Sequence, residues 1–345
     1  MRQRYIAVTF GGLLLLVVSC HHEDIPTIDS GNTPIEFSKI TSWLETKSEA
    51  ISTTSVLSSN DFKVWAQNGS NYDVFGANGT KASTSDDGKT CTYSPVRYWK
   101  TGIYNFYAVS PADWATGELS EDGLTLSFSN GWDLTTEQSQ TDLLIATQTV
   151  NGNEQVNRND GPDKVKLTFD HMLSKTSFSA RNASVNDDVG LSVTNIKVYG
   201  MNKVAMSVTK LPDGKTSWSL KEPSTQTSAF KDVSYSSAVV LTKETIDKGE
   251  AIEYKYTNVC PTFMFFPERE SFVVEVTYNQ TYGKTTTTAT KSVTINTERI
   301  AGYEYDFKLK VTEDAISIDG EPGVVPWVSK DDDDNDLVVD DTIVI

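Results

Sequence analysis

From residue 34 onward, apolar and polar residues alternate along short segments, which is the pattern of β-strands with one buried face. The segments are rich in valine, isoleucine, threonine, tyrosine and phenylalanine, which favour strands. The predicted strands cover residues 61–67, 103–111, 124–129, 165–169, 174–181, 195–200, 271–280, 291–296 and 303–318. They are separated by turns that contain glycine, such as NGS, DDGKT and PDGK. Helical periodicity is scarce, and only residues 129–146 favour a turn or a short helix.

Many short strands with frequent turns predict antiparallel sheets that pack as β-sandwiches. A patterned region of about 300 residues is too long for one small sandwich, so we expect two domains in tandem. Residues 151–164 are polar, contain glycine and proline, and mark the boundary. The sequence therefore predicts an all-β chain with one sandwich over residues 34–155 and a second over residues 163–327.

The N-terminus has the features of a secretory signal. Arg2 and Arg4 precede an apolar stretch that is shorter than the ~20 residues of a membrane-spanning helix. The sequence VVSC, which ends at Cys20, resembles the bacterial lipobox, and this resemblance implies cleavage after a signal peptide of residues 1–19 and lipidation of Cys20. Attached acyl chains would then hold the protein at a membrane. The alternative is an ordinary signal peptide with an incidental cysteine.

Residues 20–33 are polar and cannot contribute to a core, so we expect a flexible tether. His21 and His22 lie within it, and a solvated tether is favoured over a metal site. The formal charge of the chain is −17, and loss of Arg2 and Arg4 with the signal gives −17 − 2 = −19. Such a surface repels nucleic acid, which we exclude as a partner.

No motif for catalysis, a metal or a cofactor stands out. The chain lacks G-x-S-x-G, H-E-x-x-H, C-x-x-C, Walker and G-x-G-x-x-G sequences, so we expect no enzyme and no cofactor. His171 follows Asp170 on a predicted strand, where neighbouring side chains point to opposite faces, which favours a structural histidine. The Asp331–Asp334 run lacks the spacing of a calcium loop and favours a solvated linker. Cys91 and Cys260 follow no metal spacing and are either paired or two isolated buried thiols.

Several aromatic residues leave a further choice open. They are Tyr93, Tyr98, Trp99, Tyr104, Phe106 and Tyr107. They could stack on a sugar, but their place in alternating strands favours packing in the core.

Four segments, in this order, carry a resemblance to a known family. They are NDFKVWA, YSPVRYWKTGIYNFYAVSPAD, DLLIAT followed by VKLTFDHMLSKTSFSAR, and INTERIAGYEYDFKLKVTEDAISI followed by VVPWV. Together with the lipobox, they resemble the fimbrillins, which are type V pilus subunits and related lipoproteins of Gram-negative anaerobes. The resemblance implies two transthyretin-like antiparallel β-sandwiches and a surface-exposed lipoprotein of the outer membrane that builds adhesive fimbriae. Its implied partners are other fimbrial subunits and a receptor on a host or bacterial surface.

In that family, a trypsin-like protease cuts the loop after the first strand, the first strand leaves, and a strand from a neighbouring subunit fills the groove. Here the removable strand would lie in PIEFSKITSWLE, whose apolar residues are Ile35, Phe37, Ile40 and Leu44. The matching cleavage residue is Lys47, where the family has arginine. Because lysine lacks the planar guanidinium fork, either the protease differs or this subunit keeps its first strand and its lipid.

The candidate donor strand closes the chain after an acidic hinge, and the two together span residues 328–345. On one face of an extended strand it presents four apolar residues: Leu337, Val339, Ile343 and Ile345. Asp341 interrupts that face. The alternative is that this segment pairs as the last edge strand of the second domain.

The resulting hypothesis is a structural fimbrial subunit that assembles by strand exchange. The alternative is a surface lipoprotein that does not polymerise and binds a glycan or a host protein in its loops.

Overall fold

The structure is a computed structural model. It describes residues 33–38, 41–42, 61–69, 74–85, 90–112, 117–134, 140–158, 160–200, 205–211, 214–220, 229, 231–247, 252–267 and 271–326. Nearly all of the regular structure in these residues is β-strand, as the alternating pattern predicts.

The largest sheet has seven strands in the order β1-β9-β8-β5-β2-β3-β4. Their bounds are Thr41–Ser42 (β1), Thr168–His171 (β9), Leu144–Asn151 (β8), Ile103–Ser110 (β5), Asp61–Asn68 (β2), Thr80–Thr84 (β3) and Cys91–Tyr93 (β4). All neighbours are antiparallel except β1 and β9, which are parallel. A one-turn helix, α1 (Gly152–Val156), follows β8, and the Asn151 side chain caps it by accepting from the Asn153 N–H.

A four-stranded sheet in the order β13-β12-β7-β6 lies next to the seven-stranded sheet. Its strands are Thr216–Leu220 (β13), Ala205–Lys210 (β12), Thr125–Trp132 (β7) and Gly117–Leu119 (β6). Two of its strands come from before the predicted domain boundary and two from after it.

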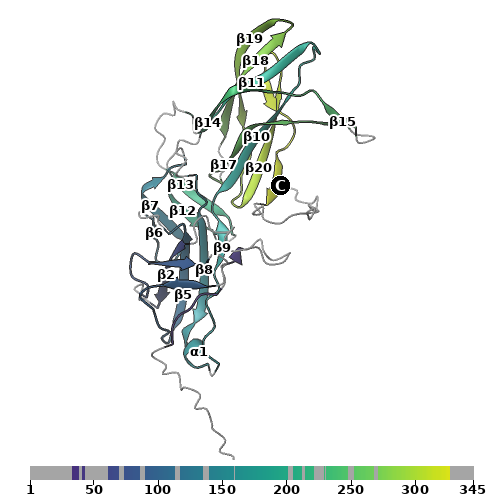
Figure 1. Ribbon diagram of the computed structural model, residues 1–345. Helices are drawn as coiled ribbons and strands as arrows, with labels where there is room; N and C mark the ends of the chain where they lie inside the picture. Colours follow the sequence, from purple (N-terminus) through teal and green to yellow (C-terminus); the bar gives the residue numbers. More distant parts are fainter. Residues whose placement is uncertain are drawn as a thin grey trace, which may run out of the picture.

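Two further sheets pack against each other. The first has the order β17-β10-β20-β21, with β22 also pairing with β20, and the second has the order β14-β11-β18-β19. The bounds are Thr257–Phe265 (β17), Ser174–Asn182 (β10), Tyr303–Val311 (β20), Ile316–Ile318 (β21), Gly323–Pro326 (β22), Lys231–Val240 (β14), Val189–Tyr199 (β11), Phe272–Tyr282 (β18) and Thr285–Ile295 (β19). A small hairpin of β15 (Thr245–Asp247) and β16 (Ile252–Tyr254) projects beside them in Figure 1.

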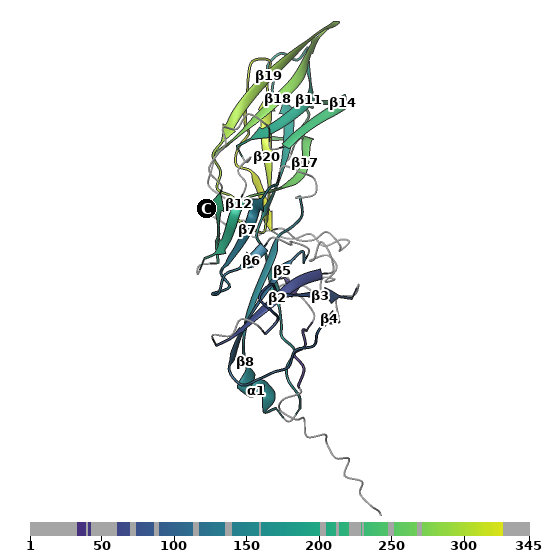
Figure 2. The same ribbon diagram turned by 90° about the vertical axis from the view of Figure 1, so that its left-hand side faces the viewer.

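The molecule is elongated (Figures 1 and 2). The seven-stranded sheet and α1 lie at one end, the β18–β19 hairpin lies at the other, and the β12–β13 sheet lies between them.

The seven-stranded sheet is covered on both faces, and alternation within its strands explains why. In β2, Phe62 and Val64 face one hydrophobic cluster, whereas Trp65 faces another. In β5, Phe106 and Tyr107 divide in the same way. We call these clusters the smaller core and the larger core. The described buried members of the smaller core are Ile35, Phe37, Phe62, Val64, Ala66, Phe75, Ala82, Trp99, Tyr104, Phe106, Ala108, Leu144, Ala146, Val165, Leu167 and Phe169.

The larger core is continuous from the back of the seven-stranded sheet to the distal sheets. Phe128 of β7 and Trp218 of β13 stack with ring centroids 6.3 Å apart, and Trp218 contacts Phe266 at 4.8 Å. Phe178 of β10 stacks on Phe307 of β20 at 5.6 Å. Phe178 also lies against Phe272 of β18, with ring centroids 6.3 Å apart. The Trp218–Phe266 and Phe178–Phe272 contacts together join the three sheets on this side of the molecule into one apolar interior.

Backbone pairing crosses the boundary predicted at residues 151–164. That stretch begins with the end of β8 and with α1, and β9 beyond it returns to pair with β8. In the same way, β12 pairs with β7. The division into domains 34–155 and 163–327 therefore stays a prediction. In the structure, strands from before the boundary pair with strands from after it, so the two halves share β-sheets.

Candidate functional site

The described chain begins with residues 33–38, which lie extended over the smaller core between two other stretches of chain. We call these residues the first segment. Pro34 pairs antiparallel with Tyr98, and Phe37 pairs parallel with Val165. The first segment therefore occupies the place of a strand, although it forms only isolated bridges.

On its antiparallel side, the first segment is held by two backbone hydrogen bonds and one tyrosine hydroxyl. The Ile35 N–H donates to the Arg97 carbonyl at 2.8 Å, and the Trp99 N–H donates to the Thr33 carbonyl at 2.8 Å. The Tyr93 hydroxyl donates to the Ile35 carbonyl at 2.6 Å. These contacts satisfy backbone groups that would otherwise be buried without a partner.

On the other side, the first segment pairs with the chain just before β9. The Val165 N–H donates to the Glu36 carbonyl at 2.7 Å, and the Ser38 N–H donates to the Val165 carbonyl at 2.9 Å. An exposed ion pair between Lys164 and Glu36, with N and O 3.1 Å apart, lies above these bonds. Exposed pairs of this kind contribute little, so the backbone bonds set the register.

The inward side chains of the first segment are buried. Ile35 is 1% exposed and Phe37 is 3% exposed, whereas Glu36 between them is exposed. Ring centroids 5.7–6.1 Å from that of Phe37 belong to Phe62, Phe75, Tyr93 and Phe106. The first segment therefore fills an apolar groove with two anchors at positions i and i+2, as an extended strand does.

The structure brings two of the predicted first-strand residues, Ile35 and Phe37, into this groove. Ile40 and Leu44, the candidate cleavage residue Lys47 and the candidate lipidation residue Cys20 lie outside the described residues. The candidate donor residues also lie outside them; these are Leu337, Val339, Ile343 and Ile345. Lipidation, cleavage and strand donation therefore stay predictions.

The sequence did not predict the walls of the groove. They are the backbone of residues 97–99 and of Val165, which lie about 60 and about 130 positions along the chain from the first segment. The apolar alternation at 165–169 gave the only signal, and it predicted a strand there without its partner. Long-range pairing cannot be found from local pattern alone.

Most aromatic residues between positions 93 and 107 pack in the two cores, as the alternating pattern favours, and Tyr107 faces the core opposite the groove. Trp99, Tyr104 and Phe106 are at most 1% exposed, and Tyr107 is 7% exposed. Tyr98 is the exception, since the residue is 44% exposed. These buried rings are therefore not positioned as a stacking surface for a sugar.

His171 of β9 forms a pair with Asp142 rather than with its neighbour Asp170. The His171 Nδ1 and Asp142 Oδ2 atoms are 2.6 Å apart, and both side chains are buried. Asp170 instead pairs with Lys210 of β12. Opposite directions of neighbouring side chains on a strand explain this separation. The sequence missed Asp142 because it lies on the loop before β8.

A second polar cluster fixes the turn after β21. The Asp319 carboxylate accepts from Arg181 Nε at 2.6 Å, from Lys310 Nζ at 2.7 Å and from the Tyr256 hydroxyl at 2.5 Å. Burial alone would raise the pKa of Asp319, but the hydrogen bonds from Lys310, Tyr256 and Arg181 outweigh it and lower the pKa to about 2. Burial, and then the bond to Asp319, raise the pKa of Tyr256 to about 12.

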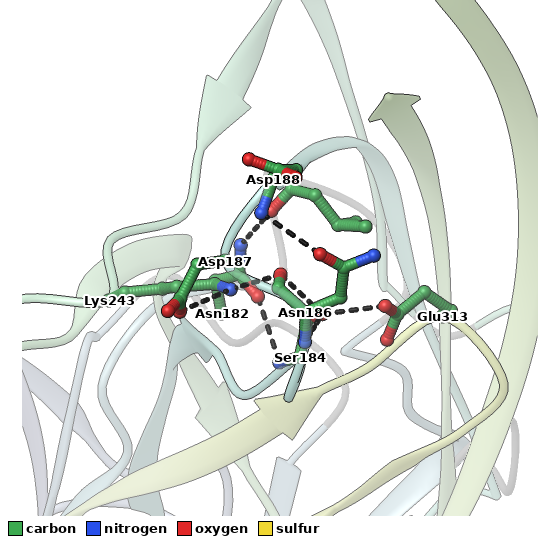
Figure 3. A network of polar contacts seen from close by, with 8 residues as sticks. Asn182, Ser184, Asn186, Asp187, Asp188, Lys243 and Glu313 are labelled. Atoms are coloured by element: carbon green, nitrogen blue, oxygen red, sulfur yellow. Dashed lines mark hydrogen bonds and ion pairs between the residues drawn. The ribbon is translucent and has the colours of Figure 1, made fainter. Parts of the chain in front are cut away.

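The turn between β10 and β11 contains a third cluster, which Figure 3 shows. Ser184 Oγ donates to Glu313 Oε1 at 2.6 Å, and Lys243 Nζ donates to the Asn186 carbonyl at 2.5 Å. The bond from Ser184 lowers the pKa of Glu313. The Asp188 N–H donates to Asn186 Oδ1 at 3.1 Å, so the cluster satisfies the polar groups of its own turn.

Cys91 and Cys260 are both free thiols, which resolves the choice that the sequence left open. Burial raises the pKa of each to about 12, so neither is a reactive thiolate at neutral pH.

Within the stretches that the structure covers, no group of three or more histidine, cysteine, aspartate or glutamate residues is arranged to hold a metal. The same stretches contain no helix of sufficient length and hydropathy to span a bilayer.

Comparison with known proteins gives a family. The sequence matches the model of a fimbrillin-like family over residues 48–327. None of the curated proteins that were compared matches the chain significantly by sequence. A solved structure of a candidate cell adhesion protein from Parabacteroides distasonis is similar, with a TM-score of 0.50 and 10% identity, and the match covers 87% of this chain and 98% of that one. This similarity shows the fold only.

Two further structures are similar over most of their length. A fimbrial protein from Bacteroides vulgatus has a TM-score of 0.48 and 15% identity, with coverage of 86% of this chain and 100% of that one. The fimbrial anchor protein Mfa2 from Porphyromonas gingivalis has a TM-score of 0.40 and 11% identity, with coverage of 86% and 98%.

Proposed function

Because this chain belongs to the fimbrillin-like family, we propose that it is a structural subunit of cell-surface adhesive fimbriae that assembles by β-strand exchange. The single observation that carries the proposal is the first segment, which closes an apolar groove with two side chains and a few backbone bonds. The matched family region begins at residue 48, so the first segment lies outside it.

Loss of the first segment would leave an acceptor for a strand. The Arg97 carbonyl and the Trp99 and Val165 N–H groups would lose their bonds to the first segment, and the floor around Phe62 and Phe106 would be exposed. Buried polar groups without partners and exposed apolar surface are both costly. An incoming extended strand corrects both at once, which is the physical basis of β-strand addition.

The C-terminal segment has the pattern that such a groove requires. Leu337, Val339, Ile343 and Ile345 share one face of an extended strand, as Ile35 and Phe37 do in the first segment. In the proposed assembly, this segment of one subunit enters the groove of the next. Other fimbrial subunits are then the partners, and no catalytic residue or cofactor is needed.

The proposed route to the surface uses the signal peptide and Cys20. Lipidation of Cys20 would deliver the protein to the outer membrane, and cleavage after Lys47 would then separate the lipid and the first segment from the body of the subunit. A subunit that is not cut keeps its anchor.

Aspartate substitutions on the two faces of the C-terminal segment test the proposal. Val339→Asp with Ile343→Asp places charges on the inward face and should abolish high-mass ladders on gels, because a dry groove does not solvate a carboxylate. The matched control, Val338→Asp with Val344→Asp, adds the same charge to the other face and should leave the ladders in place. Ladders that survive the first pair and a deletion of residues 335–345 would contradict strand exchange.

Mass spectrometry of surface material tests the cleavage step. A mature N-terminus at Ser48 supports a polymerising subunit, and Lys47→Gln should then shift the N-terminus to lipidated Cys20. A mature N-terminus at Cys20 in the unsubstituted chain would show that the first segment stays with the subunit.

One observation favours the alternative of a surface lipoprotein that binds a ligand without polymerising. A depression of about 360 Å³ is lined by Gln140, Lys175, Lys231, Thr262, Phe263 and Met264. Specific glycan or protein binding that is lost in Lys231→Ala, by a chain that stays intact and monomeric, would support this function.

A further inference from the structure

The sheet edges of this protein differ in how well they resist pairing with another strand. Edge strands are a hazard because their outer N–H and C=O groups are unpaired, and proteins usually shorten, kink or bulge them. The described edge strands β1, β4, β6, β13, β21 and β22 have five or fewer residues. β17 contains Pro261 and two shifts of register, and β14 has a shift opposite Val193 and Asn195.

β19 has none of these protections. It has eleven residues, and each pairs in register with β18 from Thr285↔Tyr282 to Ile295↔Phe272. It contains no proline, and its only charge is Lys291. It is the last strand of its sheet within the described chain and lies at the periphery in both views (Figures 1 and 2). β19 is therefore a long and regular edge.

The hydrogen-bonding direction of this edge follows from the turn. Tyr282 and Thr285 close a two-residue turn, and bonded and non-bonded pairs alternate along an antiparallel ladder that starts from such a pair. Thr286, Thr288 and Thr290 accordingly turn their backbone N–H and C=O groups away from β18. Their side chains are exposed, and none of the strands that the structure describes pairs with the edge they form.

The hydroxyl groups of the same three threonines are already ordered by β18. The Thr286 and Thr281 hydroxyls are 3.1 Å apart, and the Thr290 and Thr277 hydroxyls are 3.0 Å apart. Thr288 donates to Asn279 at 2.9 Å. Cross-strand threonine pairs stabilise a sheet, and they favour a partner strand that also carries small hydroxyl side chains.

The charge of the hairpin is compatible with the same partner. The chain as a whole carries −17, so two copies repel each other over most of their surface. The hairpin of residues 272–295 contains only Glu275, Lys284 and Lys291, which gives 2 − 1 = +1. The hairpin is therefore a place where two copies can approach without like-charge acidic contact.

We propose that β19 pairs edge to edge, antiparallel, with β19 of a second copy of this chain around a two-fold axis at Thr288. In this register, Thr286 lies opposite Thr290 of the second copy, and Lys291 lies opposite Thr285. No two charges face each other across the axis. The contact is a lateral one, separate from the first segment, and it does not depend on strand exchange. One such edge is a weak contact, and an array of copies in a fibre would strengthen it through multivalency.

Cysteine cross-linking of the full-length chain tests this pairing. Thr288→Cys should give at least about tenfold more cross-linked dimer than Val240→Cys, because opposed residues of paired strands lie within ~5.5 Å. Val240 is 73% exposed on the bulged edge β14 and is the matched control. The unsubstituted chain measures the background from the native cysteines. Equal dimer yields from the two variants would overturn the proposal.

A mixed experiment tests the register. A mixture of Thr286→Cys and Thr290→Cys chains should cross-link more than either chain alone. Adding Thr288→Pro to both chains removes an outward N–H and should abolish the excess, whereas Thr288→Val keeps the N–H and should retain it. An excess that survives Thr288→Pro would overturn edge pairing.

The cross-linking is repeated on a chain that lacks residues 335–345, so that the two proposals fail separately. In this truncated chain the two proposals together predict excess dimers without ladders. Ladders that persist would contradict strand exchange alone, and loss of the excess dimers would contradict the β19 contact alone.

Discussion

The smaller core is closed by the first segment, whereas the larger core is enclosed by strands of nine to eleven residues such as β10, β18 and β20. Four backbone hydrogen bonds hold the first segment, and β10 and β20 pair over eight positions. One core is thus closed by a segment with few backbone bonds, which is the piece replaced in the proposed strand exchange. The other is enclosed by long ladders, and we call the region around it the permanent body. The comparison teaches that a core can be fully buried even where the segment that closes it is held by few backbone hydrogen bonds.

The largest effect is expected from Phe178→Ala in the permanent body. Phe178 is fully buried and packs on Phe263, Phe272 and Phe307. The substitution should lower the free energy of unfolding by about 3–5 kcal/mol, because a cavity remains among strands that cannot move apart. Chemical denaturation measures the loss. A loss of less than about 1 kcal/mol in the free energy of unfolding would show that this core adapts to the missing ring as readily as the smaller core.

Phe37→Ala sharpens the comparison. It removes a ring of the same size, but its cost is limited by the free energy needed to release the first segment, since the segment can detach while the rest stays folded. We expect a loss of about 2–3 kcal/mol in local stability. Hydrogen exchange should then accelerate at the Trp99 and Val165 amides and stay unchanged in β11. Equal acceleration in β11 would mean that the two parts unfold together.

The next effect depends on pH and belongs to the permanent body. The pKa of Asp319 is about 2, below its ordinary value of 3.8, so its ionised form stabilises the fold above about pH 4. This stabilisation, on the order of 1–2 kcal/mol, is lost as the pH falls from about 4 through 2. Asp319→Asn should therefore be less stable than the unsubstituted protein at pH 6 and nearly equal to it at pH 2. An equal difference in stability between the two proteins at pH 6 and at pH 2 would show that the substitution acts through packing and not through the charge of Asp319.

The smallest effect is expected from Tyr93→Phe. It removes the hydroxyl that donates to the Ile35 carbonyl and should lower the local stability of the first segment by about 1 kcal/mol. Exchange at the Trp99 amide measures the change. Tyr235→Phe is the matched control, because it loses a bond to the Val259 carbonyl in the other region. Similar exchange rates at the Trp99 amide in the two variants would show that the Tyr93 hydroxyl does not stabilise the first segment in the groove.

The alternating pattern predicted the strands of both regions well. Residues 61–67, 103–111 and 271–280 became β2, β5 and β18 with small changes at their ends. Ile35 and Phe37 were placed on one strand by the family resemblance, and their i and i+2 spacing agrees with it. These are local properties, which the order of residues along the chain determines.

Partners across long distances were not predictable in this way. Nothing local places Val165 beside Glu36, Asp142 beside His171, or β12 beside β7. The short helix α1 was also missed, because residues 151–164 were interpreted as a polar boundary and the cap at Asn151 was not recognised. Pairing is decided by the packing of the whole molecule.

The ladders that cross the predicted boundary have a mechanical consequence. If only a linker joined the two ends of the molecule, tension along a fibre would stretch that linker first. Here β9 pairs with β8 and β12 pairs with β7, so a pull between the two ends of the molecule loads several backbone hydrogen bonds at the same time. In the fibre that we propose, a subunit connected in this way transmits force as one body, and the strand that a neighbour lends is the part where the chain of subunits yields or holds.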